Sequence, residues 1–270
     1  MPDETADDLL ARLAAKRDRL RRAPVLPQAS LDSLFSDYAL QHAHATTALE
    51  GNTLTLHEAQ EVLESGTTIP GKSLREHLEV VNANAAWLWL RQSTAQGVPF
   101  TEGAVLEIHR RLMQGILGDD AGFYRRIPVY IRGSHHVPPN PLRVPDLMAA
   151  WADSYTHGPG DQDPVAFAAH AHIDLAGIHP FPDGNGRTCR LVVNALLLQS
   201  DYPPALYTLT ARRAYLSALE EDHVHRDPVP FITVTATATE IMVDRWLHLV
   251  TQHADVAATW PKTSGPKTRL

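Results

Sequence analysis

The segment HPFPDGNGRTCR, residues 179–190, combines a histidine, an acid, a glycine-rich turn and two arginines. A histidine ordinarily titrates near neutrality, so His179 is suited to act as a general base toward a hydroxyl group. Asp183 offers hard carboxylate oxygens, and one carboxylate together with substrate phosphates is a usual way for a protein to bind Mg²⁺. These two residues predict a proton acceptor and a metal ligand in the same loop.

The second half of the segment predicts a phosphate site. Gly184, Asn185 and Gly186 let the backbone turn so that N–H groups converge at the start of a helix, where the helix dipole also attracts an anion. Arg187 and Arg190 are three positions apart on that helix and share a face, so both guanidinium groups can grip a polyphosphate. A base, a metal ligand, an anion site and two cations together indicate phosphoryl-type transfer from a nucleotide. A loop that merely caps a helix needs no such set at fixed offsets.

Helices must position this segment, because apolar residues recur at helical spacing on both sides of it. We expect helices over residues 9–22, 30–49, 54–65, 73–93, 101–117, 144–155, 164–178, 186–200, 212–225 and 230–254. Apolar and polar residues alternate between residues 124 and 138 before a glycine and a proline cluster, which predicts one β-hairpin. The predicted fold class is all-α: a single helical domain with one hairpin and an N-terminal helical extension.

Length and composition narrow the class of protein. The 270 residues are 44% hydrophobic, which is enough to form a real core. The net charge of -7 argues against a dedicated nucleic-acid binder, which usually carries a basic excess. A single cysteine, Cys189, rules out an internal disulfide and fits a reducing compartment. The longest apolar run, LVVNALLL, is too short to span a bilayer, and the first residues lack the apolar stretch of a secretory signal. We therefore expect a cytoplasmic protein that binds neither nucleic acid nor membrane.

Two further patterns look functional but favour a structural role. GTTIPGKS, residues 66–73, matches the P-loop string, yet it follows a helical segment instead of a strand of an α/β sheet, so we expect an interhelical loop with Ser73 as a cap. The histidine pairs at 42/44 and 170/172 lack other ligands at zinc spacing, and residues two apart on a helix point away from each other. We expect His172 to be a core residue that supports the loop at 179–190.

HPFPDGNGRTCR resembles the signature of the Fic family, His-x-Phe-x-(Asp/Glu)-Gly-Asn-Gly-Arg-x-x-Arg, and matches every fixed position. The resemblance extends over about residues 35–250, where GKSLREHLEVVNA, GFYRRIPVYIRGSHHVPPNP and FAAHAHIDLAGIHPF are also similar to stretches of Fic domains. It implies a protein adenylyltransferase, which transfers AMP from ATP-Mg²⁺ to a Ser, Thr or Tyr hydroxyl of a target protein. It also implies that the target pairs with the hairpin as an added strand, and it is compatible with a homodimer.

The resemblance implies a role for each residue of the signature. His179 would deprotonate the target hydroxyl, Asp183 would hold Mg²⁺, and Phe181 would anchor the loop in the core. The phosphate-binding residues would be Gly184, Asn185, Gly186, Arg187 and Arg190, with Arg190 at the γ-phosphate.

The nucleotide base is less well specified by the sequence. Tyr215, in the helix after the motif, is implied as a base contact. Many relatives have an asparagine near the end of that helix, where this chain has His223 nearby instead. Other nucleotides, or a phosphocholine donor, therefore stay open as alternatives to ATP.

A second motif, TTALEGN at residues 46–52, resembles the inhibitory motif of the family, (Ser/Thr)-x-x-x-Glu-(Gly/Asn), through Thr46, Glu50 and Gly51. A carboxylate beside Arg190 would occupy the guanidinium that the γ-phosphate needs, and it would repel a triphosphate. The alternative is that Glu50 is a solvated residue of the last helical turn.

These motifs predict an order of regions along the chain. We expect an N-terminal helical extension (1–34), an inhibitory helix region (35–66), a catalytic core (67–255) and a disordered tail (256–270).

Three functions are consistent with both motifs. The favoured one is a self-inhibited protein adenylyltransferase in which Glu50 competes with the γ-phosphate for Arg190. The second is the reverse enzyme, in which Glu50 positions a water molecule that removes AMP from a modified protein. The third is a non-catalytic nucleotide-binding regulator, which the presence of His179 disfavours.

Overall fold

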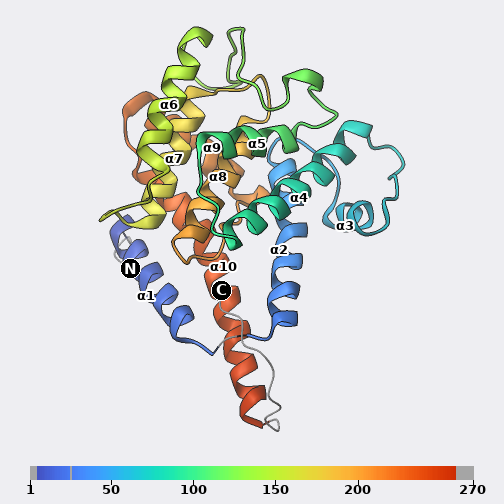
Figure 1. Ribbon diagram of the computed structural model, residues 1–270, viewed down its shortest axis with the longest axis vertical. Coiled ribbons are helices and arrows are strands. Elements are labelled where there is room, and N and C mark those ends of the chain that lie inside the picture. The colour runs from blue at the N-terminus through green and yellow to red at the C-terminus, as the bar shows by residue number, and fades with distance from the viewer. Residues whose placement is uncertain (1–4, 25, 260–270) are drawn as a thin grey trace.

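A computed structural model describes residues 5–24 and 26–259, and the side chains of these residues up to 252. Within those ranges the chain forms ten α-helices, and every helix expected from the sequence is present (Figure 1). They are α1 (Ala6–Arg22), α2 (Gln28–Ala48), α3 (Leu56–Ser65), α4 (Leu74–Ala95), α5 (Glu102–Leu112), α6 (Val144–Tyr155), α7 (Pro164–Ile178), α8 (Asn185–Gln199), α9 (Arg212–His225) and α10 (Val229–Thr259). Short 3₁₀ turns lie at Gly118–Asp120, Pro141–Arg143 and Leu209–Ala211. The all-α fold class is confirmed.

Polar caps set where several helices begin. Ser73 precedes α4 and closes a capping box with Glu76, in which each side chain bonds the backbone N–H of the other. Thr55 and Glu58 do the same for α3. Gly66 ends α3 in the left-handed conformation, with φ of 68°. The P-loop-like string therefore lies between two helices, as expected, with Ser73 as a cap.

The helix α8 is the central element, since twelve of its fifteen residues are buried. It packs most extensively on α7 and also contacts α4, α5 and α2. Asn194, fully buried on α8, donates to Tyr38 Oη on α2 over 2.7 Å, and Tyr38 donates to the Ala205 carbonyl over 2.8 Å. These polar contacts fix α2 relative to the helix that begins in the 179–190 segment.

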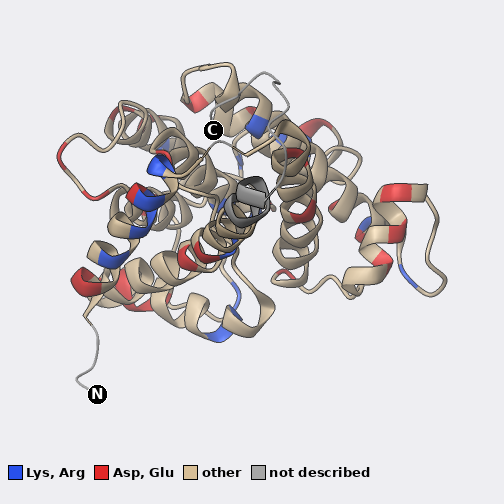
Figure 2. Cartoon of the chain, turned by 90° about the horizontal axis from the view of Figure 1, so that it is seen from below, with Lys and Arg blue, Asp and Glu red and all other residues tan. Residues whose placement is uncertain are grey.

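The first helix is packed against the rest of the domain, although it carries many charged residues. Leu9, Leu10, Leu13 and Leu20 are buried, and α1 packs extensively along α10. Ion pairs also join the two helices, as the side chain of Glu240 on α10 accepts bonds from both Arg12 and Lys16. Basic and acidic positions are interspersed over the chain when it is seen from below (Figure 2).

The last helix enters the expected tail. α10 includes residues 256–259, where Ala257 and Ala258 are good helix formers. Residues 260–270 of the expected tail lie outside the described residues. Among the described residues, no helix combines the length and the hydrophobicity that a membrane span requires.

The predicted hairpin at residues 124–138 is not formed, and the described residues contain no β-strand. The segment is an irregular loop whose side chains Ile127, Tyr130 and Val137 are 65%, 85% and 69% exposed, so the alternating pattern meets no core face. Its backbone is held by side chains instead of a partner strand. Arg125 donates to the carbonyls of Ile127 and Pro139 over 3.2 and 2.6 Å.

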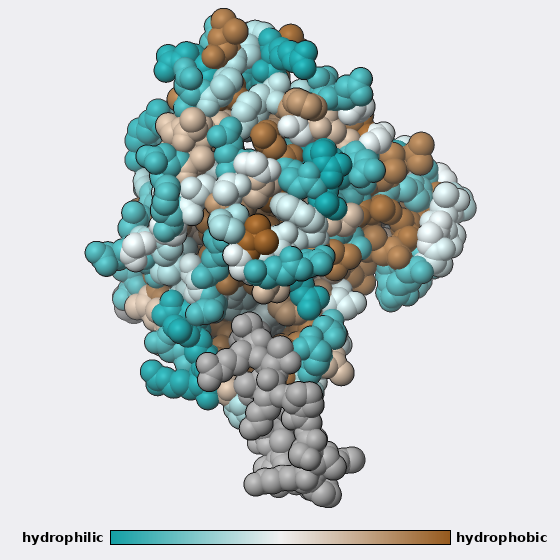
Figure 3. Space-filling model, viewed as in Figure 1, coloured by the Kyte–Doolittle hydropathy of each residue, from teal (hydrophilic) through white to brown (hydrophobic). Residues whose placement is uncertain are grey.

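The helix α3 and its flanking loops form a lobe beside α4 (Figure 1). On the face shown in Figure 3, hydrophobic residues gather over this lobe and the neighbouring α4 region. Exposed apolar side chains on these two helices include Leu56, Leu74, Val81 and Leu88.

Candidate active site

The 179–190 segment forms the connection from α7 to α8. His179 ends α7 in the left-handed conformation, with φ of 50° and ψ of 58°, which is uncommon for a residue other than glycine and typical of functional sites. Phe181 is fully buried, as expected. The side chain of Asn185 closes the loop, because its Oδ1 accepts from the Phe181 N–H and its Nδ2 donates to the Phe181 carbonyl. Asn185 therefore shapes the loop with its side chain, and only its backbone N–H at the helix start is available for an anion.

The ring of His179 is set up as a proton acceptor. Its Nδ1 lies 3.3 Å from the Ala176 carbonyl, so this nitrogen donates and Nε2 carries the free lone pair. Burial lowers the pKa of His179 to about 4, and the nearby charge of Arg125 acts in the same direction. The pKa thus lies below the near-neutral value expected from the sequence, and the ring is uncharged at physiological pH.

Two residues that sequence reasoning missed hold this loop. Arg125, only 3% exposed, donates to the His179 carbonyl over 2.8 Å, and its own N–H donates to Pro180. His109, on α5, stacks on Phe181 with ring centroids 3.7 Å apart. Because His109 Nδ1 accepts from a backbone N–H, its Nε2 donates to the Asp183 carbonyl over 3.0 Å. Both residues are far from the motif in sequence, so no local spacing pointed to them.

Two glycines of the motif are required by geometry. Gly184 has φ of 78°, and a Cβ there would lie 2.7 Å from Met113 Sδ. Gly186 has no unusual φ, but a Cβ there would lie 2.5 Å from Glu50 Oε1 and 3.1 Å from Arg190 Nη1. The first glycine makes the turn, and the second makes room in front of Arg190.

The structure brings the two sequence motifs together at Arg190. This residue is 1% exposed, and its Nε and Nη2 donate to the hydroxyl and carbonyl of Thr46 over 2.8 and 2.9 Å. Its Nη2 also contacts Glu50 Oε1 at 2.7 Å. Glu50 lies in the turn after α2, where Gly51 follows with φ of 102°. One turn of α2 and the residues after it therefore provide most of the partners of this guanidinium.

Tyr215 lies beside Arg190 and is almost fully buried. Its hydroxyl accepts from Arg190 Nη1 over 3.3 Å and donates to His172 Nε2 over 2.8 Å. His172 is fully buried, and burial holds its pKa well below the ordinary value, so it accepts this bond as a neutral ring. In this arrangement Tyr215, expected as a base contact, supports the arginine, and His172 is the core residue that the sequence suggested.

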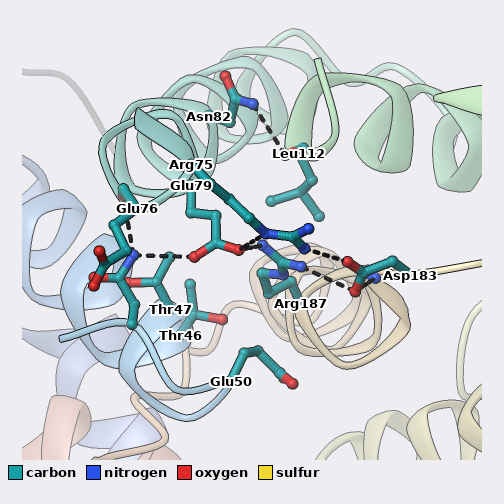
Figure 4. Close-up of polar contacts among 12 residues, drawn as sticks. Thr46, Thr47, Glu50, Arg75, Glu76, Glu79, Asn82, Leu112, Asp183 and Arg187 are labelled. Carbon is teal, nitrogen blue, oxygen red and sulfur yellow. Dashed lines mark hydrogen bonds and ion pairs between the residues drawn. The ribbon is translucent and has the colours of Figure 1, made fainter. Parts of the chain in front are cut away.

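The other arginine of the motif, Arg187, belongs to a separate cluster (Figure 4). Arg187, 2% exposed, lies 3.2 Å from Glu79 Oε1 on α4 and 3.2 Å from Asp183 Oδ1. Arg75, also on α4, pairs with Glu79 over 3.1 Å and with the other oxygen of Asp183. Burial works to raise the pKa of Asp183, but Arg187 and Arg75 outweigh it and lower that pKa. Asp183 is therefore an ionised carboxylate.

The donor chemistry of Asp183 fits Mg²⁺ in one mode only. Among the described residues, no group of three or more His, Cys, Asp or Glu side chains is arranged to hold a metal ion. A cage made by the protein is thus not present in this part of the chain. Asp183 is 40% exposed and ionised, which suits a single protein ligand that completes its metal shell with substrate phosphates.

A cavity of about 510 Å³ opens at the meeting point of these groups. Glu50, His179, Gly186 and Arg190 line it, together with loop residues 131–134 and residues of α9 between Tyr215 and His223. His179, the start of α8 and the Glu50–Arg190 pair thus face one space, whose volume is in the usual range for a small-molecule site.

The fold and the loop define an all-helical domain with a histidine and a glycine-rich helix start at its centre. The family model of the Fic/DOC family matches residues 99–197. The chain therefore carries a Fic/DOC family domain, and the resemblance drawn from the sequence is confirmed.

Known relatives share most of this chain. "Protein adenylyltransferase Fic" of Nematostella vectensis is 35% identical over 244 residues, 89% of this chain and 56% of that protein. The protein of the same name in Drosophila ananassae is 36% identical over 245 residues, 88% of this chain and 47% of that protein. The chain thus spans about half the length of these relatives. Among solved structures, Fic-1 from C. elegans has a TM-score of 0.83 and 29% identity, covering 92% of this chain and 73% of that one.

Proposed function

We propose that this chain is a protein adenylyltransferase that transfers AMP from ATP to a hydroxyl side chain of a target protein. The observation that carries the proposal is the single cavity shared by the unprotonated Nε2 face of His179, the start of α8 and Arg190. The name of the curated relatives, protein adenylyltransferase, supports the same reaction.

The residues of the loop divide the reaction between them. His179 accepts the proton of the target hydroxyl as its oxygen attacks the α-phosphorus, and the bond from that phosphorus to the β-phosphate bridging oxygen breaks to release pyrophosphate. The backbone N–H groups of Asn185 and Gly186 stabilise the charge that develops on the α-phosphate. Arg187 and Arg190 hold the departing phosphates. Mg²⁺, when bound through Asp183, neutralises phosphate charge.

The target protein would dock along the loop at residues 124–138. This loop borders the cavity through residues 131–134 and exposes Ile127, Tyr130 and Val137 to solvent. Exposed apolar side chains next to a catalytic cavity suit a protein substrate, whose hydroxyl must reach His179.

We further propose that the region around Glu50 inhibits the enzyme. The Glu50 carboxylate contacts Arg190 at 2.7 Å. It lies in the space that a side chain at position 186 would need. Because a carboxylate and a γ-phosphate compete for the same donors, ATP binds productively only when Glu50 withdraws. Thr46 holds the guanidinium in position from the same turn of α2.

The test is labelling with α-³²P-ATP. Glu50→Gly should raise self-labelling about tenfold or more over the wild type, and Glu50→Gly with His179→Ala should return it to background while nucleotide binding persists. Equal labelling of wild type and Glu50→Gly would overturn self-inhibition, and retained labelling in the double variant would remove His179 as the base. Parallel reactions with other α-labelled nucleoside triphosphates identify the preferred donor.

The reverse reaction is a second candidate, because Glu50 and His179 line one cavity and Glu50 is 38% exposed. In that case Glu50 would position a water molecule for attack on an AMP–protein bond. Incubation with an adenylylated protein separates the two: release of AMP by the wild type, lost in Glu50→Gly, would assign the reverse reaction.

A further inference from the structure

We propose that Arg75 is a second inhibitory residue, which competes with the divalent cation for Asp183. The inference rests on the proposed function, since it concerns the metal that nucleotide transfer requires. In the resting protein the guanidinium of Arg75 occupies Asp183 Oδ2, while Arg187 occupies Oδ1. A cation that binds Asp183 must therefore displace Arg75, independently of whether Glu50 leaves Arg190.

The four side chains form a closed ring with no net charge (Figure 4). Arg75 contacts Asp183, Asp183 contacts Arg187, Arg187 contacts Glu79, and Glu79 contacts Arg75. Each acid thus has two guanidinium partners, and each guanidinium has two acids. A divalent cation entering this ring would meet two positive groups, so one of them has to move before Asp183 can act as a ligand.

Burial decides which arginine moves. Arg187 and Glu79 have side chains only 2% and 9% exposed, so both are fixed in the protein. The side chain of Arg75 is 54% exposed and can turn into solvent. An ion pair of this exposure contributes little free energy, because water competes for both charges. Arg75 is therefore a reversible competitor and not a structural anchor.

The place of Arg75 in its helix points the same way. It is the second residue of α4, where the positive end of the helix dipole disfavours a cation. The partial positive charge at the N-terminus of α4 is already balanced by the carboxylate of Glu76, which accepts a hydrogen bond from the Ser73 N–H over 2.8 Å. Within its own helix Arg75 pairs only with Glu79, one turn further along, and its partner across the site is Asp183.

The ring is also connected to the segment that follows Glu50. Asn52 Nδ2 donates to Glu79 Oε2 over 3.0 Å and to the Glu76 carbonyl over 3.0 Å. The turn after α2 thus holds Arg190 through Glu50 and steadies the ring through Asn52. The Glu50–Arg190 and Arg75–Asp183 contacts are therefore separate, but the turn after α2 supports both of them.

The experiment measures how strongly nucleotide binding depends on the metal. Binding of an ATP analogue with a methylene bridge between the α- and β-phosphorus is followed by calorimetry at a series of free Mg²⁺ concentrations and in EDTA, in the Glu50→Gly background. Arg75→Ala should lower the half-saturating Mg²⁺ concentration about 1.5-fold to fivefold, the range for losing a partly exposed ion pair. Affinity in EDTA should not change.

A matched control lies on the same helix. Arg91 is paired with Asp32 at 3.3 Å and makes no contact with the ring, so Arg91→Ala removes the same charge without touching Asp183. It should leave the Mg²⁺ midpoint unchanged, and Arg75→Lys should give an intermediate value. Unchanged or raised midpoints in Arg75→Ala would overturn the proposal. Affinity lost equally in EDTA would also overturn it, by making Arg75 a phosphate ligand. Failure of the Glu50→Gly protein itself to bind the analogue would instead refute the proposed function.

Discussion

Arg190 is a buried cation, and the carboxylate that pairs with it is that of Glu50. Its other partners, the Thr46 hydroxyl and carbonyl and the Tyr215 hydroxyl, are neutral acceptors. Removing Glu50 therefore leaves a guanidinium that still has its geometry but lacks a counter-charge. Such a residue is prepared for an incoming phosphate, because its position is fixed before the ligand arrives.

The charge of Glu50 and its bulk can be separated by an isosteric change. Glu50→Gln keeps the shape of the side chain and a carbonyl acceptor for Arg190, but it removes the repulsion of a triphosphate. We expect labelling with α-³²P-ATP to lie between that of the wild type and that of Glu50→Gly. Labelling equal to the wild type would show that occupancy alone inhibits.

The low pKa of His179 is directly measurable. The ¹³Cε1 resonance of its ring, assigned by its loss in His179→Gln, should titrate with a midpoint near pH 4 because burial disfavours the charged form. The ring should therefore stay neutral from pH 8 to pH 5.5. A midpoint near 6.5, the ordinary histidine value, would contradict the buried environment of this residue.

At the scale of elements, the loop around His179 depends on a residue outside the motif. Arg125 joins the 124–138 loop to the end of α7 by donating to the carbonyls of His179, Ile127 and Pro139. The position of His179 and the shape of the proposed docking loop are thus set by the same guanidinium.

Arg125→Met keeps the aliphatic length but leaves four carbonyls, those of His179, Ile127, Pro139 and Ile178, without this donor. At about 1 kcal/mol for each lost bond, we expect urea unfolding to show a loss of about 2–4 kcal/mol. Transfer activity in the Glu50→Gly background should fall as well. The neighbouring Arg126 is exposed, and Arg126→Met should change neither quantity appreciably.

Sequence alone predicted the elements well and their tertiary connections poorly. All ten helices followed from apolar spacing and from caps such as Ser73, because helix signals are local. The hairpin failed because the alternation at residues 127–131 meets no core, and a strand needs a partner that local pattern cannot supply. His109 and Arg125 were missed for the same reason: their roles come from contacts across 54 to 74 positions of the chain.

At the scale of the molecule, the first described helix, α1, packs against the last, α10. The leucines of α1 supply the apolar contact, and Glu240 receives Arg12 and Lys16 at 2.7 Å each. Hydrogen bonding by Arg12 is the main cause that lowers the pKa of Glu240 to about 2, and Lys16 adds to it.

The stability that Glu240 provides should depend on pH. Its folded-state pKa is depressed, so the contribution is complete above the unfolded value of about 4.3 and is lost as pH falls toward 2. Glu240→Gln should therefore lower the free energy of unfolding at pH 7, and the difference from the wild type should narrow between pH 5 and pH 3. Glu64→Gln, at an exposed site on α3, is the control for lost charge. A difference that stays constant with pH would argue that Glu240 acts through packing.

Gly186 has a consequence for how this protein can evolve. The space left by its missing Cβ is occupied by the Glu50 carboxylate, and the same space borders the place proposed for the phosphates. A larger residue at position 186 would displace the Glu50 carboxylate and obstruct the proposed phosphate site in a single step, so a substitution there would not relieve the proposed inhibition without loss of activity. A lineage that came to need a permanently active form would instead have to change Glu50 or shed the turn that carries it.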